Sequence, residues 1–450
     1  MKDIKQISEH SYAATAEDGR VYTISNRVGD DFSPLFWRLS SDSWESMPAS
    51  VAGEQVAPFG PDNLLPGHIR EIIGGNNLAP GVLDRQHGLI FGQGLFLYKL
   101  RFQNGEIVKE WVNDLEIEAW LKSWDAVKFA KSALTDYLYL RGFFNSYHLE
   151  RGYRIGRPAR IAKLKHIPAT HARLEWPSSG KAEDVKYIIT GDFEHQCIGG
   201  TRRYPLFDEK NPAKHSVSAA YNNSYSFGRT FYSIPQYWGA LRWLIRGSEI
   251  PTIFKYVTDN GLNLAYHIHS PQAYWDNKRQ MLRQINPECP EAEIEKKISD
   301  ITKQLLDNLT EVLAGKENAG KFFHTVDFID DMGKTVSWQI DPIDQKIKDF
   351  VDSQLKISEA ASSAITSGMG LHPALSNLII NGKLASGSEL LYAYKLFLSS
   401  DTEIPESTVL GPINKAIEFN FPGKGIRAGF YHRIVHTEEA TSTANRMKNQ

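Results

Sequence analysis

Hydrophobic positions recur at helical spacing in several stretches of the chain and at strand spacing between them. The clearest helical stripe steps by four, three, four, four and three residues and consists of Ile294, Ile298, Ile301, Leu305, Leu309 and Val312. Gly315 is expected to end this helix. Weaker helical patterns lie at residues 79–90, 114–140, 390–398 and 405–417. These stretches predict a chain with several amphipathic helices.

Strand patterns alternate with these helices. Residues 95–102 have a period of two with apolar side chains on both phases, which predicts a strand buried on both faces. Short strand candidates separated by Gly, Pro and charged turns predict a small antiparallel sheet, and they are Phe143–Leu149, Arg160–Ile167, Lys186–Thr190 and Cys197–Tyr204. The predicted fold class is therefore α+β.

Two long helices are predicted on either side of a small insert. The first begins near Pro235, and we expect Gly247 and Pro251 to kink or split it. In the second, Asp341 is a candidate N-cap and Pro342 a candidate first helical residue, with the helix ending near Gly368. The insert contains strand candidates at 261–269, 321–329 and 335–340 around the 294–312 helix, so a β–α–β–β order is predicted.

Charge and cysteine content narrow the function classes. The chain of 450 residues has 51 basic and 53 acidic residues and a formal net charge of −2, so no global positive field draws it onto nucleic acid. Cys197 and Cys289 are far apart and neither belongs to a CxxC pair, which argues against a zinc site or a disulfide framework. Because no signal-peptide core and no run of about 18 apolar residues occurs, we expect a soluble chain that does not enter a membrane.

Motifs for catalysis or cofactor binding are weak. His432 and His436 are four residues apart but lack the HExxH pattern. His267 and His269 share one strand face, where a surface or subunit-interface role is favoured over metal binding. The acidic residues near position 330 surround a predicted turn, and they are Asp327, Asp330 and Asp331. No P-loop or nucleophile elbow occurs, and Gly92-Gln93-Gly94 lacks the third glycine of a dinucleotide fingerprint. We predict no cofactor, no metal and no enzymatic activity.

Three stretches resemble portal proteins of tailed bacteriophages, of the lambdoid siphophage type. The first is residues 136–145 with 164–173, and the second is residues 232–240, similar to the start of the family's long helix. The third is AITSGMGLHP at 364–373, followed by ASGSE at 385–389 and Ile-Pro-Glu at 404–406. This spacing is similar to the family's helix, G-hydrophobic-P-P turn, polar loop and SGSE-type helix, with His372 in place of the first proline.

The resemblance implies the portal fold, with an α+β wing, two stem helices and a clip. The implied organisation is an irregular N-terminal arm at 1–60, wing at 61–233, stem helix at 234–258, clip insert at 259–341, stem helix at 342–366, channel loop at 367–389, C-terminal wing and crown helices with a strand at 390–436, and flexible tail at 437–450. The loop residues Asn381, Lys383 and Ser386 are candidate transient contacts to DNA phosphates, and a solvated flexible loop is an equal alternative.

The function that the resemblance implies is a homo-oligomeric ring of twelve subunits at one capsid vertex. Double-stranded DNA would enter and leave through the ring, which would dock large terminase, capsid and scaffold proteins and a head-completion adaptor. The protein would be assembled in the bacterial host cytoplasm and reside in the virion. Another head-tail connector protein, or an unrecognised metal-dependent hydrolase or nuclease, remains an alternative.

Overall fold

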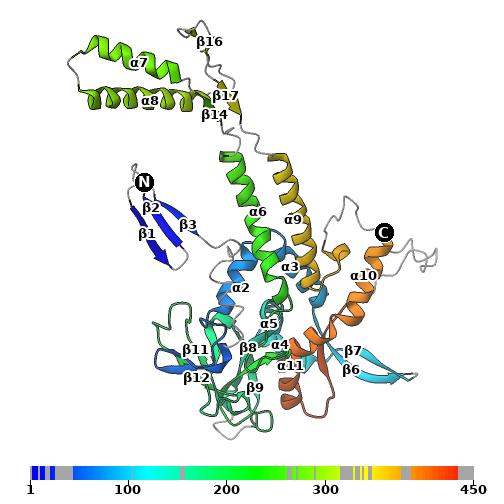
Figure 1. Cartoon of the computed structure of the whole chain (residues 1–450). Helices are drawn as coiled ribbons and strands as arrows, with labels where there is room; N and C mark the ends of the chain where they lie inside the picture. The colour runs from blue at the N-terminus through cyan, green and yellow to red at the C-terminus, as the bar shows by residue number, and fades with distance from the viewer. Residues whose placement is uncertain are drawn as a thin grey trace. The chain divides into compact units, whose positions relative to one another are not determined.

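The structure is a computed structural model of the whole chain (Figure 1). It describes residues 3–8, 11–15, 21–25, 44–103, 105–152, 158–260, 266–269, 272–287, 290–314, 328–329, 335–336, 339–342, 347–376 and 387–433. The chain forms two compact units, the first comprising residues 1–245 and 362–450 and the second residues 246–361.

The first unit contains six helices within its described part. They are α2 (Leu65–Gly74), α3 (Ala79–Phe91), α4 (Leu115–Ser123), α5 (Ala126–Leu140), α10 (Gly387–Ser400) and α11 (Glu403–Asn420). Single 3-10 turns connect other segments, at η1 (Trp44–Ser46), η3 (Ala169–His171), η4 (Ala182–Asp184), η5 (Trp238–Ala240) and η7 (Pro373–Leu375). Pro66 and Pro80 lie in the first turns of α2 and α3, where a missing backbone N–H costs no hydrogen bond. Asp114 and Asp125 accept backbone hydrogen bonds at the N-termini of α4 and α5.

Small antiparallel sheets complete this unit. Three-stranded sheets have the order β13-β8-β9, β10-β11-β12, β18-β6-β7 and β1-β2-β3, and β4 pairs with β5. Their strands are β1 (Asp3–Ser8), β2 (Ser11–Thr15), β3 (Val21–Ser25), β4 (Ala49–Val51), β5 (Glu54–Val56), β6 (Leu95–Gln103), β7 (Glu106–Val112), β8 (Gly142–Leu149), β9 (Ile161–Ile167), β10 (Ala172–Leu174), β11 (Tyr187–Thr190), β12 (Arg202–Pro205), β13 (Val217–Asn223) and β18 (Arg427–Phe430). The predicted α+β class is confirmed.

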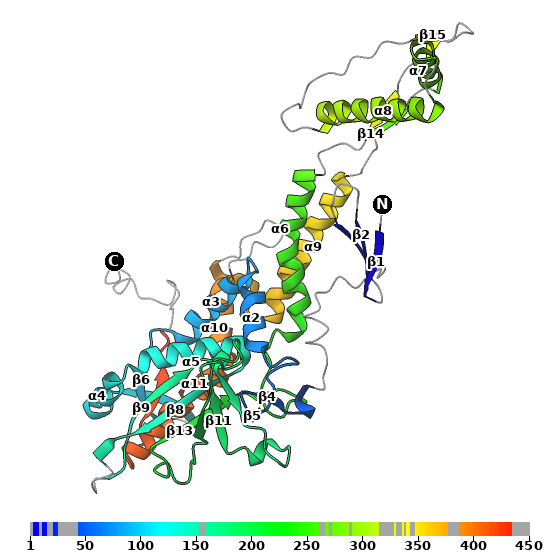
Figure 2. The same ribbon diagram turned by 90° about the vertical axis from the view of Figure 1, so that its left-hand side faces the viewer.

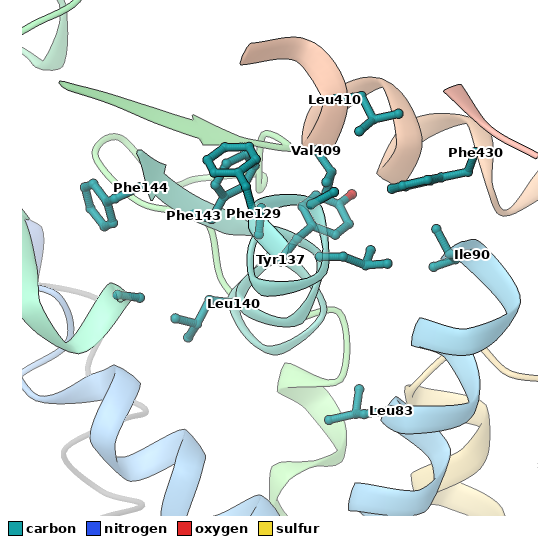
Figure 3. Close-up of a cluster of buried hydrophobic side chains, with 14 of the residues drawn as sticks. Leu83, Ile90, Phe129, Tyr137, Leu140, Phe143, Phe144, Val409, Leu410 and Phe430 are labelled. Carbon is teal, nitrogen blue, oxygen red and sulfur yellow. The ribbon is translucent and has the colours of Figure 1, made fainter. Parts of the chain in front are cut away.

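Helix α5 lies at the centre of the core of the first unit (Figure 3). Its buried side chains include Phe129, Tyr137 and Leu140, and they meet Phe143 and Phe144 from β8. From other directions the core receives buried residues of α3, α11 and β18, among them Leu83, Ile90, Val409, Leu410 and Phe430. This arrangement joins residues before position 150 to residues after position 400, so the C-terminal helices are part of the same folding unit as the N-terminal half.

Helices α6 (Leu241–Asn260) and α9 (Ile347–Gly368) run from one unit into the other and lie side by side in both views of the ribbon (Figures 1 and 2). Helix α6 continues through Gly247 and Pro251, so of the predicted kink or split the split does not occur. A proline at 251 removes only the hydrogen bond to the carbonyl of Gly247, four residues earlier, and the flanking turns keep theirs. Among the helices that the structure describes, none is long and apolar enough to cross a membrane.

The second unit contains an insert between these two helices. Its elements are β14 (Tyr266–His269), α7 (Gln272–Ile285), α8 (Glu291–Ala314), β15 (Phe328–Ile329), β16 (Thr335–Val336) and β17 (Gln339–Pro342). The ion pairs Arg279–Glu295 and Arg283–Glu291 show that α7 and α8 run antiparallel, because the residue number rises in one helix as it falls in the other. Ile294 and Ile298 of the predicted apolar stripe are buried.

Three sequence expectations for these segments were wrong in detail. The insert has two helices rather than one, because α7 is rich in polar residues and lacks a strong apolar stripe. Asp341 and Pro342 belong to β17, and the helix at first expected from 342 starts at Ile347. Residues 1–60 include five paired strands, β1–β3 and the β4–β5 pair, where an irregular arm was expected, since short strands with isolated apolar residues give a weak sequence signal.

Two strand expectations also differ. The segment Cys197–Tyr204 forms a strand only from Arg202, because Cys197 lies in a turn with positive φ. The strand at residues 95–102 is not buried on both faces, since Phe102 is 78% exposed. The described part of the chain therefore leaves several apolar side chains of β6 exposed.

Candidate loop site between α9 and α10

The segment that follows α9 is tightly packed. Met369 and Leu371 are buried on either side of Gly370, which has a φ of +69°. A Cβ atom at Gly370 would overlap the side-chain amide of Gln236, and one at Gly368 would overlap Cβ of Ala240. Both glycines are therefore required by close approach, and the left-handed backbone at 370 is a second reason for glycine there.

Hydrogen bonds from distant residues hold this turn. The buried amide of Gln86, on α3, donates to the Met369 carbonyl oxygen over 2.6 Å. The Arg141 guanidinium donates to Oε1 of Gln236 over 3.1 Å, which fixes the amide that lies over Gly370. A cavity of about 210 Å³ adjoins the turn and has both a cation and a carboxylate, Arg141 and Asp401, in its lining. The turn is thus set by tertiary contacts.

Tyr237 forms part of the floor of this cavity. It is 1% exposed, and its hydroxyl donates to the Tyr139 carbonyl oxygen over 2.9 Å. Burial raises the pKa of Tyr237 well above its ordinary value, so the hydroxyl stays protonated and remains a donor. Tyr237 is therefore a core residue, whereas the nearby Trp243 is 39% exposed.

His372 begins the next short helix, η7. Its Nδ1 accepts a hydrogen bond from the Ala374 backbone N–H over 3.2 Å, which satisfies one free donor at the helix start. The φ of His372 is −58°, within the range that a proline ring imposes. His372 therefore has a backbone angle that a proline could also adopt, and its ring adds a cap.

The chain resumes in the described part at α10, where Ala393 and Phe397 are buried in the same core. Ala374 and Leu375 are buried before the loop. Residues 377–386 thus lie between two segments that are each fixed in the first unit. The predicted contact residues Asn381, Lys383 and Ser386 fall outside the described residues, so their role stays a prediction.

The other motifs have structural roles where the structure describes them. The His432 Nε2 lies 3.0 and 2.9 Å from the carbonyl oxygens of Leu89 and Ile90, at the C-terminus of α3. Gly92 and Gly94 form the turn from α3 to β6, beside Tyr431. His436 and the predicted acidic turn, consisting of Asp327, Asp330 and Asp331, fall outside the described residues. Within the described ranges no group of three or more His, Cys, Asp or Glu side chains could hold a metal ion.

The two glutamines that hold the turn were not predicted from the sequence. Gln86 occupies a position on the apolar stripe of α3, between Val82 and Leu89, where a polar side chain must find a partner. That polar residue within the apolar stripe indicates from sequence that Gln86 has a buried hydrogen-bond partner. Nothing in the sequence near Gln236 indicates its place over Gly370.

Comparisons with known proteins give structural likeness alone. No family model matches the chain, and no curated protein matches its sequence. A chain from the neck of a native gene transfer agent particle with C12 symmetry superposes with a TM-score of 0.49 at 11% identity, over 85% of this chain and 86% of that one. A chain from the virion of a native gene transfer agent particle gives 0.47 at 11% identity, over 85% and 86%. One from the neck of an empty particle, with C6 symmetry, gives 0.49 at 10% identity, over 85% and 87%.

Proposed function

We propose that this chain is the portal subunit of a tailed-phage-like particle, a structural protein that forms a homo-oligomeric ring at one capsid vertex and conducts double-stranded DNA. The proposal rests on the sequence resemblance to portal proteins and on the helix–insert–helix order of the fold. In this assignment α6 and α9 are the stem helices and the insert is the clip.

The observation that carries the proposal is the pairing of the first and last strands of the insert. Tyr266 lies opposite Pro342 and His269 opposite Gln339, so β14 and β17 form an antiparallel pair. The chain therefore leaves α6 and returns to α9 through adjacent strands. A closed insert of this kind can vary or bind partners without disturbing the two helices that carry it.

Close contacts between α6, its preceding turn and α9 support the paired stem. Within the first unit, Gly368 approaches Ala240 so closely that a Cβ atom would not fit. Within the second unit, the Arg246 guanidinium donates to Oε1 of the buried Gln354 over 3.2 Å. Each unit thus has its own contact between the two helical segments.

Weak contact with DNA is appropriate for a conduit. A strongly basic channel would bind phosphates and release counterions, which would oppose sliding, and the formal net charge of this chain is −2. We propose that the loop at residues 367–389 faces the channel, with Asn381, Lys383 and Ser386 making brief phosphate contacts. Large terminase, capsid and scaffold proteins and a head-completion adaptor are the proposed protein partners.

The mass of the purified protein tests the ring. Twelve copies of a 50.8 kDa chain give about 610 kDa, which mass photometry or native mass spectrometry resolves from smaller species. A closed ring is expected. A stable monomer across micromolar concentrations would contradict the proposal.

Replacement of the loop tests DNA conduction. We would replace residues 377–386 with ten Gly and Ser residues, sparing Ala374 and Leu375 because they are buried. Rings should form as in the unaltered protein, while DNA packaging or retention should fall. A matched replacement of residues 153–157 is the control and should leave packaging unchanged. Loss of ring assembly, or unchanged packaging, would contradict the channel role of the loop.

A further inference from the structure

The β6–β7 hairpin is amphipathic. Cross-strand register places Tyr98 opposite Trp111 and Phe102 opposite Ile107. Because side chains alternate between faces, these residues share one face with Phe96 and Leu100. The opposite face carries charges in the outer half, where Lys99 lies opposite Glu110. The hairpin thus has one apolar and one charged face.

The outer part of the apolar face is open. Its side chains are exposed by 47% at Phe96, 47% at Leu100, 78% at Phe102, 62% at Ile107 and 36% at Trp111. Near the base, Tyr98 is buried and Lys109 pairs with Glu406 of α11, and Tyr431 contacts the Phe96 and Trp111 rings. The cyan β6–β7 hairpin projects from the rest of the first unit in Figure 1. No described residue of the chain covers its outer half.

The exposed area is large enough to contribute substantially to an interface. An aromatic side chain buries about 150–250 Å² in a core, so the exposed fractions of Phe96, Phe102 and Trp111 together amount to roughly 300 Å². Leu100 and Ile107 add to this. A standard interface uses about 800 Å² on each partner, so this face can supply the apolar centre of one. Left open, an apolar strand pair with a free edge favours aggregation.

A concave apolar surface lies on the other side of the hairpin base. It is a groove of about 470 Å³ whose lining includes Leu95, Leu97, Leu121, Ala126 and Val127. Glu118, Lys122 and Asp125 also line it, so both signs of charge are present. Each copy of the chain therefore carries one apolar projection and one groove with a mixed apolar and charged lining, and Phe96 at the hairpin base borders both.

We infer that the outer half of the β6–β7 hairpin seats its apolar face in the groove of a neighbouring copy. This inference rests on the proposed function, because a ring supplies each hairpin with one groove. Contact between two different surfaces is heterologous, and repeated heterologous contacts form a ring when the rotation between neighbours closes, and an open filament when it does not. A second copy of this chain is favoured over another partner, because every copy carries both surfaces and the ring therefore has one groove for each hairpin.

Two variants separate the surfaces. Phe102→Asp/Ile107→Asp places charge on the hairpin, and Val127→Asp places charge at the groove, where Val127 is 43% exposed and so should not disturb the core. Each variant alone should fail to form rings. Phe227→Asp is the matched control because Phe227 is 95% exposed elsewhere in the first unit, and it should assemble normally. Far-ultraviolet circular dichroism and thermal melts should show that all three variants fold.

Mixing the hairpin and groove variants gives the decisive result. Each mixed pair retains one intact contact, so the mixture should form a one-to-one dimer of about 100 kDa, twice 50.8 kDa. Rings formed by either folded variant alone would overturn the inference while leaving the proposed ring intact. A mixture that stays monomeric would overturn the pairing of hairpin with groove. An unaltered protein that is itself monomeric would instead overturn the proposed function.

Discussion

Lys109 fixes the hairpin to α11, and its removal should loosen the hairpin measurably. Its ammonium group lies 2.9 Å from Oε1 of Glu406 and 3.6 Å from Oε2 of Glu403. The Glu406 side chain is only 8% exposed, so it depends on this partner. Lys109→Met removes the charge and keeps most of the apolar stem.

The size of the expected stability loss follows from how deeply the Lys109–Glu406 ion pair is buried. Breaking a fully buried ion pair costs about 3–5 kcal/mol, because the remaining charge is left without a partner. Since Lys109 is 31% exposed, water can reach the site, and we expect a loss of about 2 kcal/mol. That corresponds to a roughly 30-fold fall in protection of the hairpin amides when they exchange by local opening.

Hydrogen exchange across residues 95–112 is the assay. Lys99→Met is the control, because Lys99 lies on the opposite face of the same strand pair. Glu406→Gln added to Lys109→Met should restore part of the protection, since it removes the unpaired charge. Equal loss in the Lys99 control, or a double variant that is worse than Lys109→Met, would refute the reasoning.

The pH dependence of this pair provides a second check. Burial lowers the pKa of Lys109, but the hydrogen bond and charge of Glu406, with Glu403, outweigh it and leave the pKa raised. A raised folded-state pKa means that the stabilisation is complete below the ordinary lysine pKa and is lost as pH rises through the folded-state value. The difference between the unaltered protein and Lys109→Met should therefore shrink only above about pH 10.5.

The remaining predictions concern the first unit. Gly370→Ala should destabilise by about 2 kcal/mol in urea unfolding, because a left-handed alanine is strained and Gln236 must move; an unchanged midpoint would contradict this. Arg173→Met should lower the free energy of unfolding by about 3 kcal/mol or more in the same assay, since the fully buried guanidinium donates to Asn63 and to two other carbonyl groups. An unchanged free energy would show that these acceptors find other donors. Burial, with the charges of two nearby lysines, lowers the pKa of His148, so the unfolded chain binds a proton first and stability falls as pH drops below the ordinary histidine pKa of 6.5. His148→Gln should flatten that slope in thermal melts, and an unchanged slope would count against it.

Helix α8 was predictable from sequence because six large apolar residues repeat on one face over more than five turns. Helix α7 was not, because its polar composition gives no comparable stripe. The strands at the N-terminus were missed for a related reason, since each is short and has few apolar positions. Local periodicity therefore identifies elements only where one face must be buried.

The candidate loop site was predictable only in its local turn. The Gly368-Met369-Gly370 sequence indicates a break after a helix, and the structure has one there. The hydrogen bond that holds the turn joins Gln86 to Met369, 283 residues apart, and no local pattern contains that pairing. The β6 pattern led to a wrong burial prediction for another reason. Apolar residues on both faces of a strand show that both faces could be buried, but they do not show that other residues cover them.

End-on electron microscopy of the purified oligomer tests the central claim most directly. Closed rings are expected, with one rotational axis, a central channel wide enough for duplex DNA, and hairpins that each contact the adjacent subunit. Compact monomers, open filaments or two-fold dimers without a channel would contradict it.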